Sequence, residues 1–254
     1  MSIISAEKEK NLKKVEKEIQ RKEFSNVDLW ILPELFTTGF TYSLFSKIAE
    51  RKFDSKTINF LEILSQEYTI GIAGSHLIVE NENKYYNLGF IISPSKGLVY
   101  QYKKIHLWGI EKDYFVAGQE IPKPINFENK AKIGLSICYD LRFPEVSRNL
   151  VVNGAEVLIT TSAWPGVRIE HFNLLASARA LENTCFHIAL TRTGEEEDII
   201  KTIYPGSSRI IDPMGEVIAK ADKKEQVLTA ILKAEKLAET REYIPVLKDR
   251  KGKF

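Results

Sequence analysis

The sequence IGLSICYDLRFPEVSRNL, residues 133–150, decides the fold class. It begins with an apolar run of the length of a buried strand, which the polar pair Tyr139 and Asp140 ends. Pro144 then opens a stretch with helical spacing that closes near Gly154. A strand, a turn and a helix in this order are typical of α/β proteins, in which helices cover the faces of a sheet.

The same alternation of strands and helices continues on both sides of this stretch. Helical spacing of apolar residues predicts helices over residues 6–23, 54–68, 143–155 and 170–183. Apolar runs predict strands over residues 27–34, 70–79, 86–93, 98–104, 131–138, 156–163, 185–191 and 226–232, and a hairpin over 207–221 with its turn at 212–215. No linker, low-complexity tract or repeat interrupts the pattern, so we expect one continuous domain over residues 1–254.

Composition and charge exclude several classes of function. The chain of 254 residues has 36 basic and 34 acidic side chains, a net charge of +2. This balance argues against a nucleic-acid-binding surface, which needs an excess of clustered cations. No apolar run approaches the roughly 18 residues that cross a bilayer, and nothing near Met1 resembles a secretion signal. We therefore expect a cytoplasmic protein with no membrane partner.

Two cysteines, Cys138 and Cys185, are too few to suggest a disulfide framework. Cys138 ends an apolar strand and precedes a polar turn that leads into a helix. In this setting a nucleophile becomes accessible, and backbone N–H groups lie nearby to receive an oxyanion. The alternative is a small apolar core residue, which is the ordinary role of a cytosolic cysteine. Cys185 lies inside a predicted strand and takes that ordinary role.

A cysteine nucleophile needs a base, and spacing alone selects none of the histidines. The four candidates are His76, His106, His171 and His187. Their spacings to the cysteines match no zinc pattern, so no metal is expected. A carboxylate tuned by burial and a cationic neighbour is an alternative base. Glu34 ends the apolar run LWILPE and Lys104 closes VYQYKK, although a cap or surface charge and a solvated lysine are the ordinary alternatives.

Three segments occur together in one order: LPELFTTGF (32–40), YKKIHLWGIEKDYFVAG (102–118) and IGLSICYDLRFPEVSRNL (133–150). With them the chain resembles the nitrilase superfamily of carbon–nitrogen hydrolases over about nine tenths of its length. PELFTTGF, CYDLRFPE and AWPGVR are most similar to the branch that includes ω-amidase. The resemblance implies a four-layer αββα sandwich that pairs into a homodimer.

The resemblance also implies roles for four residues. Glu34 matches the general base, Lys104 the catalytic lysine and Cys138 the nucleophile. Glu111 falls where the family often keeps a second glutamate that orients substrate and lysine; a solvated loop carboxylate is the alternative. The implied reaction cleaves a small amide such as α-ketoglutaramate to a carboxylate and ammonia through a cysteine thioester, without a cofactor.

An ω-amide of a dicarboxylic acid carries a carboxylate at its far end, and the planar guanidinium of arginine matches its two oxygens. Arg142 and Arg168 are the candidates, although Arg142 is equally placed to form an ion pair with Asp140 or Glu145. The backbone N–H of Tyr139 is expected to help Lys104 stabilise the oxyanion. Aromatic residues that either line the substrate pocket or belong to the core are Phe36, Tyr42, Tyr139 and Trp164.

The two ends of the chain carry further expectations. Relatives begin with a strand before the first helix, whereas only MSIIS precedes it here. We therefore expect the opening strand to be shortened or absent, through a native truncation or a misplaced start, which leaves an unpaired sheet edge. The C-terminal segment 233–254 has apolar residues among charges and is compatible with a place at a dimer interface.

Other functions remain open from the sequence. Within the same superfamily the alternatives are another aliphatic amidase or an N-carbamoyl amidohydrolase, with nitrile hydrolysis less favoured by CYDLRF. An inactive relative that acts as a binding or assembly module is the alternative outside the enzymes. A thiol-redox role ranks low because no resolving cysteine lies near Cys138 in the sequence.

Overall fold

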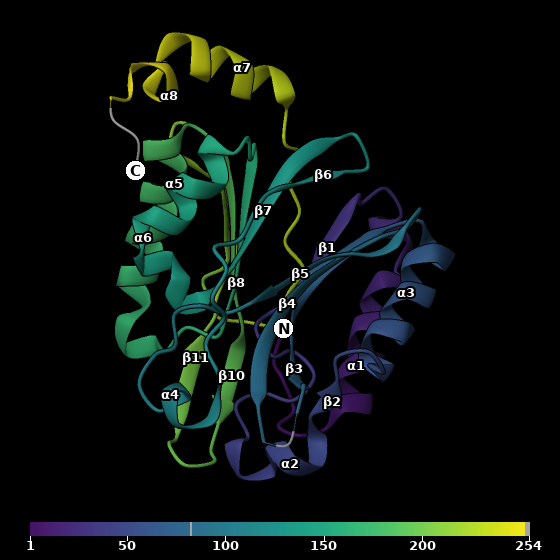
Figure 1. Ribbon diagram of the computed structural model, residues 1–254. Coiled ribbons are helices and arrows are strands. Elements are labelled where there is room, and N and C mark those ends of the chain that lie inside the picture. The colour runs from purple at the N-terminus through teal and green to yellow at the C-terminus, as the bar shows by residue number, and fades with distance from the viewer. Residues whose placement is uncertain (82, 252–254) are drawn as a thin grey trace.

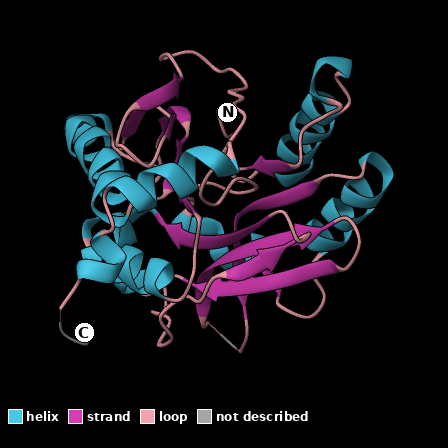
Figure 2. Ribbon diagram, turned by 90° about the horizontal axis from the view of Figure 1, so that it is seen from above, coloured by secondary structure: helices cyan, strands magenta, loops and turns pink. Residues whose placement is uncertain are grey.

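The computed structural model describes residues 1–81 and 83–251. Two β-sheets lie face to face, and helices cover the outer face of each, as Figure 1 shows from the side and Figure 2 from above. This is the four-layer αββα sandwich, so the predicted fold class is confirmed. In the described part of the chain no helix is long and apolar enough to cross a membrane.

The first sheet holds strands from the first half of the chain. They are β1 (Leu29–Ile31), β2 (Glu50–Arg51), β3 (Gly71–Val79), β4 (Tyr85–Ser93) and β5 (Gly97–Lys103). The order is β1-β3-β4-β5, with β2 also beside β3. Strands β1 and β3 are parallel, whereas β3, β4 and β5 form an antiparallel meander. Strand β1 therefore lies at an edge of this sheet.

The second sheet holds strands from the second half of the chain. They are β6 (Ile125–Phe127), β7 (Ala131–Ile137), β8 (Val157–Ser162), β9 (Phe186–Thr191), β12 (Arg209–Ile211) and β13 (Val217–Lys220). Strands β7, β8 and β9 are parallel neighbours at its centre. A separate hairpin pairs β10 (Thr193–Glu196) with β11 (Thr202–Pro205).

Helices α1 (Lys8–Ile19) and α3 (Lys56–Tyr68) cover the first sheet, and α5 (Pro144–Val152) and α6 (Ile169–Asn183) cover the second. Helices α7 (Ala234–Tyr243) and α8 (Val246–Asp249) lie near the C-terminal end of the chain. The shorter helices are α2 (Phe45–Ile48), α4 (Glu111–Tyr114) and the 3₁₀ turns η1 (Lys22–Phe24), η2 (Tyr42–Leu44), η3 (Cys138–Arg142) and η4 (Gly166–Arg168).

The apolar periodicity of each helix matches its buried face. On α1 the side chains of Leu12, Val15 and Ile19 are buried against the first sheet, and each contributes about 1.5–3 kcal/mol. Between the sheets, side chains from β3 and β4 meet side chains from β7 and β8. This central layer includes Ala73, Ile91, Leu135 and Ile159.

Two strand predictions differ from the structure. The run 27–34 predicts a short buried strand that ends at Pro33, but β1 spans only Leu29–Ile31, because the chain turns before Glu34 and Leu35 adopts a φ of 47°. The prediction of a strand over 226–232 is wrong: this extended segment belongs to no sheet, because no strand lies beside it to accept its hydrogen bonds. The predicted hairpin over 207–221 is confirmed as β12 and β13, with Asp212 capping the turn.

Residues 1–7, which precede α1, form no strand. Only an isolated parallel bridge joins Ser2 to Thr193, whose N–H donates to the carbonyl of Met1. Sequence patterns did not indicate β10 and β11, because β10 includes Gly194 and two glutamates, and a third glutamate follows it in the turn. These polar strands are held by pairing with each other, not by an apolar pattern.

Candidate active site

Glu34 lies just beyond the carboxyl end of β1, and the backbone after it is held in an unusual conformation. Leu35 has a φ of 47°, in the left-handed region that non-glycine residues seldom adopt. The strained turn is retained because the Leu35 N–H donates to Ser75 Oγ at 3.0 Å on β3. The turn leaves the Glu34 side chain fully buried between the two sheets.

Cys138 occupies the corresponding place on the second sheet. It follows β7 directly, opens η3, and has a φ of 46°. Such a strained strand-to-helix turn is typical of a nucleophile that must project from the end of a strand. No backbone carbonyl in the described part of the chain accepts from the N–H of Tyr139, so this donor is free to bind an oxyanion.

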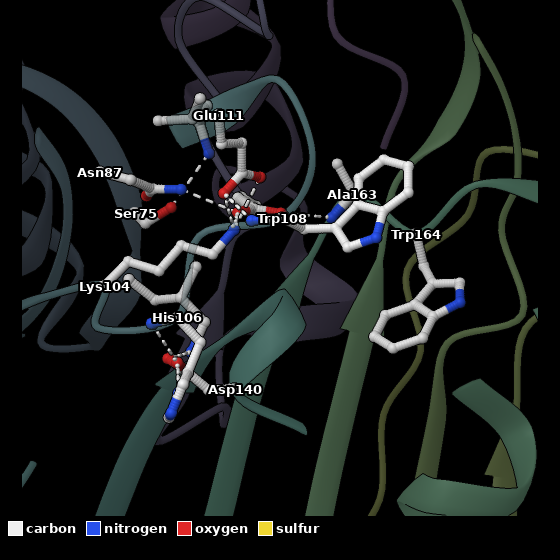
Figure 3. A network of polar contacts seen from close by, with 12 residues as sticks. Ser75, Asn87, Lys104, His106, Trp108, Glu111, Asp140, Ala163 and Trp164 are labelled. Carbon is white, nitrogen blue, oxygen red and sulfur yellow. Dashed lines mark hydrogen bonds and ion pairs between the residues drawn. The ribbon is translucent and has the colours of Figure 1, made fainter. Parts of the chain in front are cut away.

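Lys104 joins two carboxylates at the centre of the molecule. Its Nζ lies 2.8 Å from Glu34 Oε1 and 2.8 Å from each carboxylate oxygen of Glu111. Figure 3 shows the amino group directed at Glu111, with Asn87 and Ala163 on opposite sides of the network. The side chain of Lys104 is fully buried, so a counter-charge is required to keep it an ammonium.

Further donors also bind the two carboxylates. Asn87 Nδ2 donates to Glu34 Oε1 at 2.8 Å, and the backbone N–H of Ala163 donates to Glu34 Oε2 at 2.9 Å. The N–H of Trp108 donates to Glu111 Oε2 at 3.2 Å. Each carboxylate is therefore oriented by donors from at least two parts of the chain, which fixes the geometry before a substrate arrives.

Burial and mutual charge shift the pKa values of the cluster. Burial lowers the pKa of Lys104, but the charges of Glu111 and Glu34 outweigh it and raise that pKa well above its ordinary value. Burial, opposed by Lys104, raises the pKa of Glu111 from 4.5 to about 7. Burial and the negative charge of Glu34 raise the pKa of the Cys138 thiol. The thiol is therefore protonated at rest, and an adjacent base must remove its proton during reaction.

Asp140 anchors the turn that carries Cys138. Its carboxylate accepts from Tyr102 Oη at 2.9 Å and from the N–H of Ile137 at 3.0 Å. It also bonds the N–H and the Nδ1 of His106, whose ring stacks on Phe143. These contacts tie η3 to the segment after β5, and so hold Cys138 and Lys104 in a common frame.

Comparison with known families identifies the fold and its chemistry. The family model of the carbon-nitrogen hydrolases matches residues 1–242. The chain belongs to the carbon–nitrogen hydrolase family. The protein is therefore a hydrolase that acts on carbon–nitrogen bonds.

Two relatives of this carbon–nitrogen hydrolase are named 2-oxoglutaramate amidase. The protein is 34% identical to the one from Bacillus subtilis, over 94% of this chain and 90% of that protein. It is 35% identical to the one from Paenarthrobacter nicotinovorans, over 89% of this chain and 79% of that protein. Among solved structures, Saccharomyces cerevisiae Nit3, a member of branch 10 of the nitrilase superfamily, matches with a TM-score of 0.88 and 28% identity, over 97% of this chain and 92% of that one.

None of the four histidines of this hydrolase takes the place of a base beside Cys138. His76 and His187 are buried away from the thiol, and burial lowers the pKa of each to about 4. His106 binds Asp140, and His171 binds Arg142 at 3.2 Å. The carboxylate of Glu34, which forms a hydrogen bond with the thiol, is the remaining candidate for the base. Cys185, by contrast, is fully buried in the core under α5, as expected.

Three of the predicted substrate-binding residues form one group. The guanidinium of Arg142 lies 5.0 Å from the ring centroid of Trp164 and 5.9 Å from that of Tyr139. No ion pair joins Arg142 to Asp140 or Glu145 within the described residues, so the structural alternative for Arg142 is not observed. Its side chain is half-buried.

The other predicted pocket residues divide between the site and the core. Arg168 lies 4.8 Å from the ring centroid of Trp108, and its carbonyl accepts from Trp164 Nε1. Tyr42 packs against the core cluster that includes Phe45 and Phe115, and its pKa is raised by burial and by the charge of Glu111. Phe36 is fully buried and packs in the core beneath α1 and α3, in line with the core alternative that the sequence left open.

Sequence patterns missed the residues that orient Glu34. Asn87 lies within β4, and its side chain reaches a residue 53 positions away. The backbone N–H of Ala163 also donates to Glu34, which lies 129 positions earlier in the sequence. The only sequence signal for Asn87 is a polar residue within an otherwise apolar strand, where an unsatisfied amide is costly. A backbone donor such as that of Ala163 leaves no signal in the side chain.

Proposed function

We propose that the protein is an ω-amidase that releases ammonia from the terminal amide of a 2-oxo dicarboxylic acid such as 2-oxoglutaramate. The observation that carries this proposal is the buried cluster in which Lys104 bridges Glu34 and Glu111 beside Cys138. Two relatives with 34% and 35% identity bear the name of this activity. The cluster supplies a base, a cation and a thiol, which amide cleavage requires.

In the first half-reaction, the Glu34 carboxylate accepts the proton of the Cys138 thiol while the sulfur attacks the amide carbon. The Lys104 ammonium and the N–H of Tyr139 stabilise the oxyanion that forms. Loss of one such donor raises an activation barrier by about 2.7–4 kcal/mol. As the carbon–nitrogen bond breaks, protonated Glu34 gives its proton to the leaving nitrogen, and ammonia departs from the thioester.

In the second half-reaction, the same carboxylate activates water. Glu34 accepts a proton from the water that attacks the thioester carbon, and the second oxyanion binds the same donors. The carbon–sulfur bond then breaks, the carboxylic acid leaves, and the proton returns to Cys138. Glu111 keeps Lys104 oriented and charged through both steps, since its two oxygens hold the ammonium.

Ammonia release from a panel of amides tests the proposed substrate. The panel contains 2-oxoglutaramate, glutamine, a short aliphatic amide and an N-carbamoyl amino acid. We expect the highest kcat/KM for 2-oxoglutaramate. Turnover of another amide with none of 2-oxoglutaramate would exclude the ω-amidase proposal, and failure with every amide would favour a binding or assembly function.

The proposed nucleophile has a separate test. Intact-protein mass spectrometry of rapidly quenched enzyme and substrate should show an acyl adduct, and peptide mapping should place it on Cys138. The matched control is Cys185, which should remain unmodified because it is fully buried. An adduct on any other residue would contradict the proposed mechanism.

We propose that Arg142 binds the far carboxylate of the substrate. Arg142 comes four residues after the nucleophile, and its guanidinium lies with Trp164 and Tyr139. Among the described residues, His171 is the side chain with which it makes a polar contact. Arg142→Lys should raise KM for 2-oxoglutaramate about tenfold or more, because lysine cannot form the bidentate pair. Arg168→Lys is the matched control, and an equal effect of both substitutions would contradict this assignment.

We propose a homodimer that pairs through α6 and the turn before it. Val167 and Leu174 are 86% and 72% exposed, and Leu181 is half exposed on the same helix. Contiguous exposed apolar side chains are typical of an interface. Light scattering should give a dimer for the native chain and a monomer for Leu174→Glu. Phe53→Glu, on the opposite side of the sandwich, is the control that should leave the dimer intact.

The C-terminal segment is tied to its own subunit in the structure, and we propose that it borders this interface. Arg241 donates to the carbonyls of Thr184 and Ala155, which fastens α7 to the end of the second sheet.

We also propose that residues 1–254 form one catalytic domain in the cytoplasm. The shared core between the sheets and two unpaired cysteines support these proposals.

A further inference from the structure

Helix α6 carries a buried arginine that none of the proposed reaction steps uses. Arg179 is only 5% exposed, and its guanidinium leaves its own helix to reach η3, the turn that Cys138 opens. Its Nε donates to the carbonyl of Leu141 and its Nη2 to the carbonyl of Arg142, each at 3.1 Å. Its Nη1 donates to Glu182 Oε1 at 2.9 Å, and this ion pair supplies the counter-charge that a buried cation requires.

The carbonyl of Leu141 needs such a donor because of the residue that begins α5. In a 3₁₀ turn each carbonyl accepts from the N–H three residues later. For Leu141 that residue is Pro144, which has no N–H. Arg179 therefore supplies the hydrogen bond that the proline cannot, at the point where η3 meets α5.

Charged side chains hold η3 at both of its ends. The turn is five residues long, begins at Cys138 and ends at Arg142. At its start, Asp140 accepts from the N–H of Ile137 at 3.0 Å, and at its far end Arg179 holds the last two carbonyls. Cys138 has a φ of 46°, and a residue in this region keeps its conformation only where its surroundings hold it. The shape of η3 thus depends on contacts from outside the turn.

We propose that Arg179 is a positioning residue that sets the place of Cys138 and of Arg142 by holding η3 against α6. It acts through the two carbonyls that it binds, not through the thiol. Its effect on Arg142 rests on the proposed function, in which that guanidinium binds the far carboxylate of the substrate. Its effect on Cys138 requires only that the thiol reacts.

The planar fork of Arg179, more than its charge, carries this role. The charges that chiefly shift the pKa of the Cys138 thiol are those of Glu34, Lys104 and Glu111. Two donors of one rigid group reach two successive carbonyls of η3. A lysine ammonium on a flexible stem has the same charge but no fork, so lysine at this position separates the two contributions.

Steady-state ammonia release by Arg179→Lys and Arg179→Met tests the kinetic consequence. Lysine keeps a cation beside Glu182 and so protects the fold, whereas methionine keeps the length of the side chain and loses every donor. With 2-oxoglutaramate we expect kcat to fall by about 10- to 100-fold in both variants, because a misplacement of about 1 Å has such an effect. KM for 2-oxoglutaramate should also rise, because Arg142 moves with η3. KM for a short aliphatic amide should stay unchanged, because that substrate has no carboxylate.

Arg148→Met is the matched control. Arg148 lies on α5, and its Nη2 donates to the carbonyl of Glu182 at 2.7 Å near the end of α6. This variant also removes a bond from a guanidinium to a backbone carbonyl, but within the described residues that bond does not involve η3. It should keep the native kcat and KM. An equal loss of kcat in Arg148→Met and Arg179→Met would overturn the proposal, because it would indicate a general effect of weakening α6.

Amide hydrogen exchange tests the position of η3 without any substrate. The N–H of Phe143 donates to the carbonyl of Asp140 at 3.0 Å, where the turn ends. In Arg179→Lys and Arg179→Met this amide should exchange at least about tenfold faster than in the native protein, because the end of the turn opens more often. In Arg148→Met it should exchange at the native rate. Native exchange at Phe143 in both Arg179 variants would overturn the proposal, and so would faster exchange with native kcat.

The same measurements separate this inference from the proposed function. If 2-oxoglutaramate is not hydrolysed, the effect on Arg142 fails together with the proposed function. The effect on Cys138 is then judged by kcat with the amide that the native enzyme does hydrolyse, and the placement of η3 by exchange at Phe143.

Discussion

Replacing Glu111 with glutamine tests the central cluster most directly. The side chain of Glu111 gives Lys104 two of its three carboxylate contacts, each at 2.8 Å. Glutamine keeps one uncharged acceptor and turns an N–H₂ group towards the ammonium. Loss of one charge-assisted hydrogen bond costs about 1.5–3 kcal/mol. We expect kcat/KM to fall by roughly 10- to 150-fold.

The pH dependence of the same variant separates an electrostatic role from a merely structural one. Glu111 has a pKa of about 7, raised by burial. If the ionised form is needed to hold Lys104, kcat/KM of the native enzyme rises through about pH 7. Glu111→Gln cannot ionise, so its profile should lack that limb. Steady-state ammonia release between pH 5.5 and 9 measures both profiles.

The stability of this variant should change in the opposite sense to its activity. A carboxyl whose pKa rises from 4.5 to about 7 on folding binds its proton more tightly in the folded state. Its contribution is therefore favourable at low pH and is lost as pH rises from about 4.5 to 7. Relative to the native protein, Glu111→Gln should be more stable at pH 8 than at pH 5, as measured by thermal unfolding.

A matched control and a clear negative outcome complete this test. Glu120→Gln changes an exposed carboxyl that follows the same loop, and should alter neither activity nor the pH profile. The reasoning is refuted if Glu111→Gln keeps kcat/KM within threefold of the native value and retains the limb near pH 7. That result would mean that Glu34 alone keeps Lys104 charged and placed.

Three further substitutions test the site. Cys138→Ala should lower amide turnover at least about a thousandfold, because the nucleophile is lost. Its melting temperature should change little, because the substitution leaves only a small cavity. Full activity would reject the thioester mechanism. Asn87→Ala should lower kcat/KM by roughly 10- to 100-fold, because the 2.8 Å hydrogen bond to Glu34 is lost. Asn126→Ala, which removes an exposed amide, should leave kcat/KM unchanged. Equal kinetics for the two variants would contradict the orienting role of Asn87. Asp140→Asn should reduce the free energy of unfolding by about 2–4 kcal/mol, because it replaces one carboxylate oxygen with an amino group that cannot accept. Tyr102 Oη and the Ile137 N–H share one oxygen, and the backbone N–H and ring Nδ1 of His106 share the other, so one of these pairs loses its acceptor. Urea unfolding beside Glu145→Gln, an exposed carboxyl, gives the comparison, and matching midpoints would refute this prediction.

Much of the fold was predictable from local patterns. Leu12, Val15 and Ile19 follow the period of a helix that buries one face, and α1 buries these side chains. The apolar runs that form β3, β4, β7 and β8 are long enough for strands but too short for fully buried helices. The segment 226–232 has the same pattern, yet it forms no strand. A pattern reports that a segment can pair, whereas pairing also needs a neighbour.

The candidate catalytic residues were predictable by type and setting, but their environment was not. Glu34, Lys104 and Cys138 each interrupt or end an apolar run, and the family motifs assign them roles. The pKa of about 7 for Glu111 depends on how far water is excluded around it and on two charges distant in the sequence. For Phe36 the sequence left the pocket and the core as alternatives, and its packing in the core is visible only in the structure.

By itself, the amino-acid sequence determined the alternation of strands and helices, the family, and the identity of the polar groups at the strand ends. The tertiary structure alone decided that Asn87 and the Ala163 N–H orient Glu34, and that Lys104 bridges Glu34 and Glu111. The physical reason is range. Helical and strand periodicities act over a few residues, whereas hydrogen bonding, desolvation and strand pairing depend on which distant segments are brought into contact.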